Sequence, residues 1–394
     1  MNSRIPSLRS PPAIAARVVD IAPFQVMEVQ TAARELEAAG RSVIHLEIGE
    51  PDFPTPQPVL AAAQAAIAQG DLYYTSALGI PALREAIAQH YRDAYGVDVD
   101  PQRVIVTAGA SAGLLLVAAL LVDRDRRVLV TDPSYPCNRH FVRAMEGVPV
   151  GVPVGPESAY QLNAELVREN WNRDTVAALV ATPSNPTGTV IDEEELRRCA
   201  GQVSELGGNL IVDEIYQGLS YERTPSSVLA ITDRAFVISS FSKYFNMTGW
   251  RLGWVVAPPE YVRDLEKLAQ NFYISPSSVA QRAALACFAP ETLSILEQRR
   301  CEFQERRDFL VPALRELGFR IPVMPAGGFF VYADSSSLTP DSQRFASEVL
   351  QGTGVAFTSG VDFGTYRAHE HVRLAYTIAM PKLIEAVARL RAYL

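Results

Sequence analysis

The chain has 394 residues, of which 48% are hydrophobic and 20% charged, a composition typical of a globular protein with room for about two or three domains. Its formal net charge is −8 and its pI is near 5.3. This acidic balance argues against a nucleic acid or an anionic membrane as partner, because either would require a basic surface. Any anion-binding site must therefore be local.

The cysteines and the N-terminus indicate the cellular compartment. The four cysteines show no CxxC or other metal-ligand spacing, which favours a reducing compartment and predicts neither a disulfide framework nor a metal site. Residues 1–12 are polar and proline-rich, unlike a signal peptide, and no run of uncharged apolar residues is long enough to span a membrane. We expect a soluble, cytoplasmic protein.

Short runs of Val, Ile and Leu alternate with longer amphipathic stretches along the chain. The runs are nearly all apolar, which is typical of strands buried on both faces of a parallel sheet. We therefore predict an α/β protein with a large, mostly parallel central sheet flanked by helices. The expected strands are residues 103–107, 127–131, 176–181, 209–213, 235–239 and 252–256.

The two ends of the chain differ from its middle in the pattern of helices and strands that their sequence predicts. A helix is expected from residue 26 to residue 39, where Gly40 follows, because glycine commonly ends helices. A charged, heptad-like stretch predicts a long linking helix at about residues 290–317. Beyond it, short strands are expected at 328–332, 355–357 and 371–376, before a C-terminal helix. These patterns predict an N-terminal arm (1–25), a large domain (49–289) and a discontinuous small α+β domain (26–48 and 290–394).

Lysine usage draws attention to Lys243, because the chain holds three lysines and thirty-three arginines. A primary amine can condense with an aldehyde, whereas a guanidinium effectively cannot. The apolar, serine-rich segment around Lys243 would lower the cost of its neutral form and make it nucleophilic, as a Schiff-base lysine requires. The alternative is that Lys243 is a surface charge, as we expect of Lys267 and Lys382 on their helices.

Ligands of open parallel sheets gather at the carboxyl ends of the strands, so the residues there are candidates for binding. After the first strand, Gly109, Ala110 and Ser111 precede a leucine-rich helix. Small residues allow backbone N–H groups to approach an anion at a helix N-terminus, and Ser111 adds a hydroxyl, which predicts a phosphate cradle. Close packing between helix and sheet would require the same small residues.

Two further strand ends carry candidate side chains. Tyr135 follows a proline in a rigid turn, where its ring could stack on a planar cofactor or simply lie exposed in a loop. Asn185 lies in the segment Pro183-Ser184-Asn185-Pro186-Thr187-Gly188. Two prolines and a glycine fix such a loop and aim the amide side chain away from the strand end.

Charged residues complete the set. Asp213 follows an apolar strand, so we expect it to be buried, and a buried carboxylate needs a cationic or strongly donating partner. A protonated pyridine nitrogen is such a partner. Ser240 ends another strand, and Arg251 follows Lys243 by eight residues. Arg251 could clamp a phosphate in fork geometry, with a structural salt bridge as the competing interpretation.

Together these segments resemble the class I/II aminotransferases of the aspartate aminotransferase superfamily, which are pyridoxal-phosphate (PLP) enzymes of fold type I. The resemblance runs from about residue 20 to the C-terminus, with the motifs in the family's order. They are Gly49-Glu50-Pro51-Asp52-Phe53, Tyr74-Thr75 before Gly79-Ile80-Pro81-Ala82-Leu83-Arg84, Asn185-Pro186-Thr187-Gly188, Asp213-Glu214-Ile215-Tyr216, Ser240-Phe241-Ser242-Lys243, Gly249-Trp250-Arg251-Leu252-Gly253 and Val372-Arg373-Leu374.

The resemblance implies a role for each residue around the cofactor ring. Lys243 corresponds to the lysine that forms the Schiff base, and Asp213 to the partner of the pyridine nitrogen. Asn185 and Tyr216 would hydrogen-bond the ring hydroxylate, and Tyr135 would stack on the ring face. Lys243, Asp213 and Tyr216 are therefore the expected catalytic residues.

The resemblance also implies how the phosphate and the substrate are held. Gly109, Ala110, Ser111, Ser240 and Arg251 would bind the phosphate, together with Tyr74 from a second subunit, so a homodimer with shared active sites is expected. The substrate's α-carboxylate would be bound by Arg373, the backbone of Gly49 and Asn185.

The implied reaction moves the amino group of an L-amino acid to a 2-oxo acid by a ping-pong mechanism, with Lys243 as general base and then acid. The same motifs leave open a PLP-dependent C–S lyase or a cyclising enzyme, because they do not dictate the fate of the carbanion. A non-enzymatic PLP-binding sensor would need a DNA-binding domain ahead of the fold, where only about twenty-five residues precede it.

The motifs do not fix the amino donor. No additional arginine can be assigned to a second substrate carboxylate, and several aromatic residues lie in segments that border the pocket in such folds. They favour a neutral or aromatic donor, although ordinary core and interface packing would also account for them. These residues are Phe24, Tyr73, Phe272, Tyr273, Phe329 and Phe330.

Overall fold

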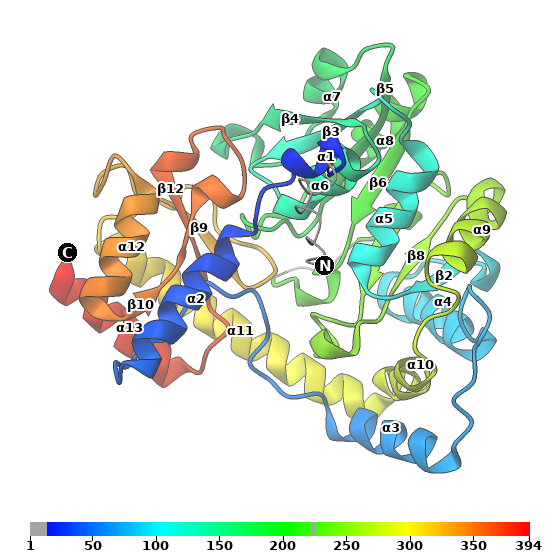
Figure 1. Cartoon of the computed structure of the whole chain (residues 1–394), viewed down its shortest axis with the longest axis horizontal. Helices are drawn as coiled ribbons and strands as arrows, with labels where there is room; N and C mark the ends of the chain where they lie inside the picture. Colours follow the sequence, from blue (N-terminus) through cyan, green and yellow to red (C-terminus); the bar gives the residue numbers. More distant parts are fainter. Residues whose placement is uncertain (1–13, 223–225) are drawn as a thin grey trace, which may run out of the picture.

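The computed structural model describes residues 14–222 and 226–394, so part of the predicted N-terminal arm, residues 1–13, lies outside the described residues. Figure 1 shows two lobes connected by one long helix, α11 (Pro290–Glu316), which is drawn in yellow. The larger lobe holds the central sheet, and the smaller one holds the C-terminal strands together with α2 (Gln25–Ala38). The division of the chain into an arm, a large domain and a discontinuous small domain remains a prediction.

The central sheet has seven strands in the order β2-β8-β7-β6-β5-β3-β4. The pairs from β4 through β7 are parallel, whereas β8 runs antiparallel to both β7 and β2. The prediction of a mostly parallel α/β sheet is thus confirmed. The strands are β2 (Val104–Thr107), β3 (Arg127–Asp132), β4 (Val148–Pro153), β5 (Thr175–Ala181), β6 (Asn209–Asp213), β7 (Phe236–Ser240) and β8 (Gly253–Val256).

Two features of this sheet differ from the sequence prediction. Strand β8 reverses direction because residues 241–252 contain only a short 3-10 turn, Thr248–Trp250, and no helix that could carry the chain back for a parallel pairing. Strand β4 was not predicted because its sequence, VPVGVP, holds two prolines and a glycine. Such residues are tolerated at a sheet edge, and β4 is an edge strand.

Alternate residues of the central strands enter two separate apolar clusters, one on each face of the sheet. In β2, Val104 and Val106 belong to one cluster and Ile105 to the other, as the two-residue period of a strand dictates. The helices of this lobe are α3 (Gln57–Gln69), α4 (Pro81–Tyr95), α5 (Ala110–Leu121), α6 (Pro136–Ala144), α7 (Ala164–Asn170), α8 (Glu193–Glu205), α9 (Val262–Phe272) and α10 (Ser278–Ala284).

The smaller lobe is built on an antiparallel sheet, β11-β12-β9, and a two-stranded parallel pair, β1-β10. Its first helix, α2, ends just before Gly40, which has a φ of +84°, so the predicted helix and its stop are confirmed. Strand β9 begins two residues later than expected, because Gly328 has a φ of +68° and is still part of a turn. The elements are β1 (Ile44–His45), β9 (Phe330–Asp334), α12 (Ser342–Thr353), β10 (Val355–Ala356), β11 (Thr358–Ser359), β12 (His371–Ala375) and α13 (Met380–Tyr393).

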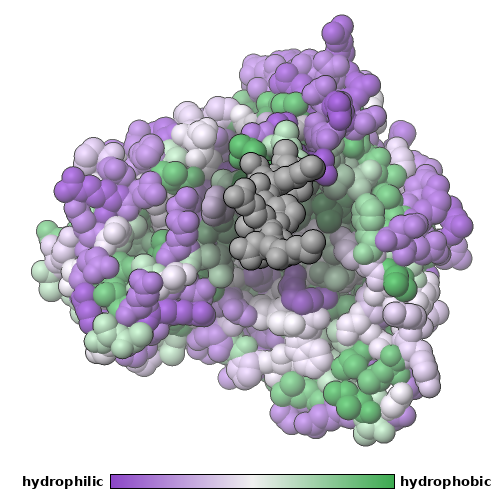
Figure 2. All heavy atoms as spheres, in the orientation of Figure 1, coloured by the Kyte–Doolittle hydropathy of each residue, from purple (hydrophilic) through white to green (hydrophobic). Residues whose placement is uncertain are grey.

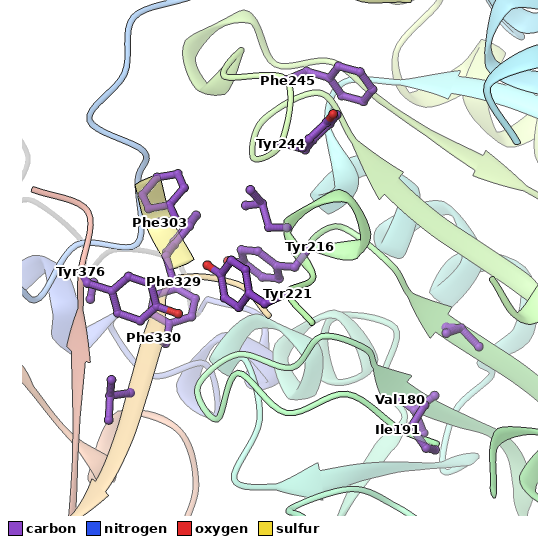
Figure 3. Close-up of a cluster of buried hydrophobic side chains, with 14 of the residues drawn as sticks. Val180, Ile191, Tyr216, Tyr221, Tyr244, Phe245, Phe303, Phe329, Phe330 and Tyr376 are labelled. Carbon is purple, nitrogen blue, oxygen red and sulfur yellow. The ribbon is translucent and has the colours of Figure 1, made fainter. Parts of the chain in front are cut away.

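Aromatic side chains fill the region where the lobes meet. Figure 3 shows Phe303 of α11 beside Phe329 and Phe330 at the start of β9, with Tyr216 of the larger lobe facing them. The ring centre of Tyr216 lies 5.3 Å from that of Phe329 and 5.7 Å from that of Phe330, edge to face in both cases. This packing fixes the end of β6 against the smaller lobe.

Within the described residues, no helix is long and apolar enough to cross a membrane.

Arg306 of α11 forms a buried ionic contact beneath the same region. Only 1% of its side chain is exposed, and its guanidinium binds both carboxylate oxygens of Asp52, at 2.7 and 3.1 Å, and Glu302 at 2.7 Å. It also lies over the rings of Phe53 and Phe303. The contact therefore attaches the long helix to the segment that leads into the larger lobe.

We predict that Arg306→Ala lowers the free energy of unfolding by about 3 kcal/mol, mainly because it removes a buried side chain packed on Phe53 and Phe303, and also because it breaks the pairs with the partly exposed carboxylates. Chemical denaturation measures the change. Arg344→Ala provides the control, since the Arg344–Glu348 pair on α12 is exposed and should contribute little. Equal effects of the two substitutions would contradict this assignment.

Candidate active site

A cavity of about 330 Å³ opens between the lobes, at the carboxyl ends of the central strands. All of the predicted site residues line it except Gly109, which directly precedes α5, and Tyr74. The structure thus brings these separate motifs together around one cavity, while the roles expected of their residues remain predictions. The predicted residues lining the cavity are Gly49, Ala110, Ser111, Tyr135, Asn185, Asp213, Tyr216, Ser240, Lys243, Arg251 and Arg373.

Lys243 follows β7 and points into this cavity. Its Nζ donates a hydrogen bond to the Gly49 carbonyl at 2.7 Å and lies 5.9 Å from the ring centre of Tyr216. Burial lowers the pKa of Lys243 from 10.5 to about 8, against the attraction of Glu50. Lys267 and Lys382 are exposed and paired with carboxylates on their own helices. The surface-charge interpretation thus fits those two lysines but not Lys243.

Asp213 is the last residue of β6 and is 5% exposed. Its Oδ1 accepts a hydrogen bond from the Ile215 N–H at 3.1 Å. Burial raises the pKa of Asp213 from 3.8 to about 6, although the Ile215 N–H and the charge of Lys243 both oppose this rise. A carboxylate in this setting would be stabilised by a further cationic donor inside the cavity.

The first turn of α5 meets Arg251 and a pair of serines. No side chain caps this helix, whose N-cap residue is Gly109 with a φ of +84°. Ser240 Oγ lies 2.9 Å from Ser242 Oγ, and Arg251 Nη1 lies 3.4 Å from the same Ser242 oxygen. Uncapped helix N–H groups, hydroxyls and a guanidinium are together the donors that bind a phosphate.

The sequence left open whether the small residues of this segment serve an anion cradle or helix packing, and two of its glycines show one use each. A Cβ on Gly109 would lie 2.5 Å from Arg251 Nη2, so this position lies directly against the guanidinium, and its φ of +84° also favours glycine. A Cβ on Gly113 would instead lie 2.9 Å from the side chain of Val255 in the sheet. The small residues thus serve both the anion cradle and the packing of helix on sheet.

Arg373 of β12 lies in the same cavity and is 2% exposed. Its Nη1 donates to Asn185 Oδ1 at 3.0 Å and its Nη2 to the Glu47 carbonyl at 2.5 Å. The guanidinium carbon lies 4.4 Å from the ring centre of Phe330 and 4.7 Å from that of Phe363. Burial lowers the pKa of Arg373 to about 10, so the group is cationic at neutral pH and rigidly placed.

Two tyrosines complete the walls. Tyr135 lies edge to face with Phe24 at 6.1 Å between ring centres, and Tyr216 packs against Phe329. Burial raises the pKa of both phenols. Both therefore remain protonated near neutral pH and can donate hydrogen bonds.

Some of the residues that we expected at the pocket lie outside the cavity of the single chain. Phe24 and Phe330 line the cavity, whereas the other four expected aromatic residues do not, namely Tyr73, Phe272, Tyr273 and Phe329. Tyr73 and Tyr74 are each 80% exposed. The sequence analysis also missed several lining residues because they come from segments without a recognisable motif, as Met27 of α2 does. These are Val26, Met27, Ile48, Leu114, Ala181 and Thr248, together with Glu50, Ile215 and Ser242 from recognised motifs.

Comparison with known proteins identifies the family. The family model described as aminotransferase class I and II matches residues 41–390, so the chain belongs to this family and is an aminotransferase. It is 38% identical to valine–pyruvate aminotransferase of Mycobacterium tuberculosis, covering 95% of this chain and 97% of the relative. It is 34% identical to aspartate/prephenate aminotransferase of Thermus thermophilus, covering 95% and 97%.

Solved structures agree with this assignment. The crystal structure of an aminotransferase from Mycobacterium tuberculosis is similar with a TM-score of 0.94 and 38% identity, over 97% of this chain and 99% of that one. Aspartate aminotransferase from Thermus thermophilus with maleate gives a TM-score of 0.92 and 34% identity, over 97% and 100%. The predicted fold type and family are thus confirmed.

The lowered pKa of Lys243 predicts its reactivity. In protein freed of bound carbonyl compounds with hydroxylamine, acetylation of Lys243 by acetic anhydride should rise with pH around 8, because only the neutral amine attacks the reagent. Peptide mass spectrometry can follow each of the three lysines separately, with Lys267 and Lys382 as internal controls. A profile for Lys243 that coincides with those of the two exposed lysines would contradict the structure.

Proposed function

We propose that this aminotransferase uses PLP bound at Lys243 and moves the amino group of an L-amino acid to a 2-oxo acid by a ping-pong mechanism. The observation that supports this best is the pairing of a buried amine and a buried carboxylate in one cavity. Their pKa values are shifted in opposite directions, to about 8 for Lys243 and about 6 for Asp213. Such opposed shifts are typical of groups that take part in catalysis.

The residues present fit this cofactor. The close approach of Arg251 to Gly109 and the uncapped start of α5 would suit the phosphate, with Ala110, Ser111 and Ser240 as further donors. Asp213 would hold the proton on the ring nitrogen, and this cation would offset the cost of burying the carboxylate. Asn185 and Tyr216 would donate to the ring hydroxylate, while Tyr135 would cover the ring face.

When bound, PLP supplies an aldehyde carbon that condenses with amines and a protonated ring that withdraws the electron pair released at the substrate's Cα. The protein supplies orientation and proton transfer. Arg373 would bind the α-carboxylate together with Asn185 and the backbone of Gly49, and so fix the direction of the Cα–H bond. Lys243 Nζ, whose pKa is near the working pH, would take this proton and later return it.

A homodimer is part of the proposal. Tyr74 is exposed and lies outside the cavity of its own chain, as expected of a residue that completes the phosphate site of a second subunit. Figure 2 shows hydrophobic side chains gathered over α3, at the lower right. A large exposed apolar surface of this kind favours burial against a partner. Analytical ultracentrifugation measures the assembly state. A protein that sediments as a monomer and is fully active at the same concentration would contradict this point. The exposed residues around α3 and α10 are Ile67, Leu72, Tyr73, Tyr74, Phe272, Ile274 and Leu285.

The cavity supports a donor with a neutral, apolar side chain. Among the described residues, its only cations are Lys243, Arg251 and Arg373, and each already has a proposed task. Phe24, Met27 and other apolar residues form much of the remaining wall. The relative named valine–pyruvate aminotransferase supports the same class of donor.

Lysine substitutions test the proposed mechanism. Lys243→Ala should lower kcat for transamination by about a thousandfold or more, because both the nucleophile and the proton carrier are lost. Lys243→Arg keeps the positive charge and should be nearly as inactive, since guanidinium neither condenses nor exchanges a proton at neutral pH. The measurement is formation of 2-oxo acid from an amino donor. Substantial turnover by the arginine variant would show that Lys243 contributes only charge.

The donor class predicts a difference in specificity. We expect kcat/KM for valine to exceed that for aspartate by about a hundredfold or more, because an apolar site without a cation must desolvate the second carboxylate. Assays with pyruvate and 2-oxoglutarate as acceptors measure this ratio. Alanine serves as the control for a neutral donor with the smallest side chain. Preference for aspartate over valine would overturn the proposed donor class but leave the role of Lys243 intact.

A further inference from the structure

The first turn of α2 forms one wall of the cavity. Phe24, Val26 and Met27 all line it, and Phe24 contacts the ring of Tyr135. Figure 1 shows α2 with the smaller lobe, apart from β6, which ends at Asp213, and β7, which Lys243 follows. The position of this turn over the cavity therefore depends on contacts that the central sheet does not provide.

Asp362 supplies one of these contacts. The N-cap residue of α2 is Phe24, and no side chain of the helix itself caps its first turn. Instead Asp362, in the 3-10 turn Gly360–Asp362, accepts a hydrogen bond from the Gln25 N–H through Oδ1 at 3.1 Å. Asp362 is 2% exposed. A buried carboxylate from a distant segment thus performs the role that a capping side chain usually has.

The other surroundings of Asp362 connect it to the substrate site. Among the described residues, neither its buried Oδ2 nor Nε of Arg373 has a hydrogen-bond partner of normal geometry, and the charges of Asp362 and Arg373 attract each other. The next residue, Phe363, packs on the Arg373 guanidinium at 4.7 Å. Arg139 of α6 donates to the Asp362 carbonyl at 2.8 Å. The segment around Asp362 therefore contacts α2, the Arg373 guanidinium and α6.

The exposure of Met27 within the cavity indicates a function for the first turn of α2. Its side chain is 53% exposed although it lines the cavity. An apolar side chain held in that position gains burial when another apolar group enters the cavity beside it. The chain before α2 is held to the larger lobe by its own ion pairs, since Arg17 pairs with Glu146 and Asp20 pairs with Arg143 of α6. Loss of the Asp362 contact should therefore loosen the turn locally.

We propose that Asp362 is a positioning residue that holds the first turn of α2 over the cavity, so that Phe24 and Met27 form an apolar contact surface for the side chain of the amino donor. The inference rests on the proposed transamination of neutral amino acids. It assigns the discrimination between short and branched aliphatic donors to a residue that itself touches neither donor nor cofactor.

A series of donors tests this role. In Asp362→Ala, kcat/KM should fall about tenfold for valine and leucine, mainly through KM, but less than about threefold for alanine, whose methyl group gains little from the turn. Asp362→Asn keeps an oxygen acceptor for the Gln25 N–H and removes the charge near Arg373. It should retain a valine-to-alanine ratio close to that of the wild type.

Phe24→Ala reports on the contact surface without altering a buried carboxylate, so it remains informative if Asp362→Ala fails to fold. It should lower the same valine-to-alanine ratio, and in combination with Asp362→Ala the losses should be clearly less than additive. Equal losses for all donors in the Asp362 variants, with Asn no better than Ala, would show that Asp362 acts through Arg373 and would overturn the inference. An unchanged ratio in Phe24→Ala would also overturn it. A wild-type enzyme that forms no 2-oxo acid would instead refute the proposed function.

Discussion

The burial of one amine opposite one carboxylate is the constraint on which the site depends. Taking Lys243 out of water lowers its pKa to about 8, and taking Asp213 out of water raises its pKa to about 6. Within the described part of the chain, Lys243 donates one side-chain hydrogen bond, to the Gly49 carbonyl, and Asp213 accepts one, from the Ile215 N–H, and both residues line the same cavity. The fold therefore sustains two unfavourable burials that a cofactor with a carbonyl group and a basic ring nitrogen would relieve.

A short stretch of backbone joins this pair to Arg373. The carbonyls of Leu46, Glu47, Ile48 and Gly49 accept, in turn, the Ala375 N–H, Arg373, Thr377 Oγ1 and Lys243 Nζ. Four successive residues thus connect β12 of the smaller lobe to the lysine of the larger one. This arrangement explains how two lobes with separate sheets can hold the Arg373 guanidinium and the Lys243 amine in fixed relation, as their proposed roles require.

Much of this architecture could be predicted from local sequence. The apolar strands around residues 104–107 and 209–213 were evident because both faces of each strand are buried, and their carboxyl ends indicated Asp213 and the glycine-rich start of α5. Asn185 was recognised from the two prolines and the glycine of its loop, and Arg251 from its position eight residues after Lys243. The family comparisons confirm the class of enzyme that these motifs indicate.

Other features could not be predicted because they arise from contacts between distant segments. Met27 belongs to a helix with no motif, and only the packing of the lobes brings it to the cavity. Asp362 resembles any loop aspartate in the sequence, although it caps a helix more than three hundred residues earlier in the chain. Strand β4 was missed because prolines hide an edge strand from a search for apolar runs.

The central claim concerns a single covalent linkage, and chemical reduction tests it most directly. Borohydride treatment of the purified enzyme, followed by peptide mass spectrometry, should place one pyridoxyl group per subunit on Lys243, because only this lysine combines burial, a lowered pKa and a neighbouring acid. The exposed Lys267 and Lys382 should remain unmodified in the same digest. A pyridoxyl group on either of them, or on no lysine of the fully loaded enzyme, would contradict the account.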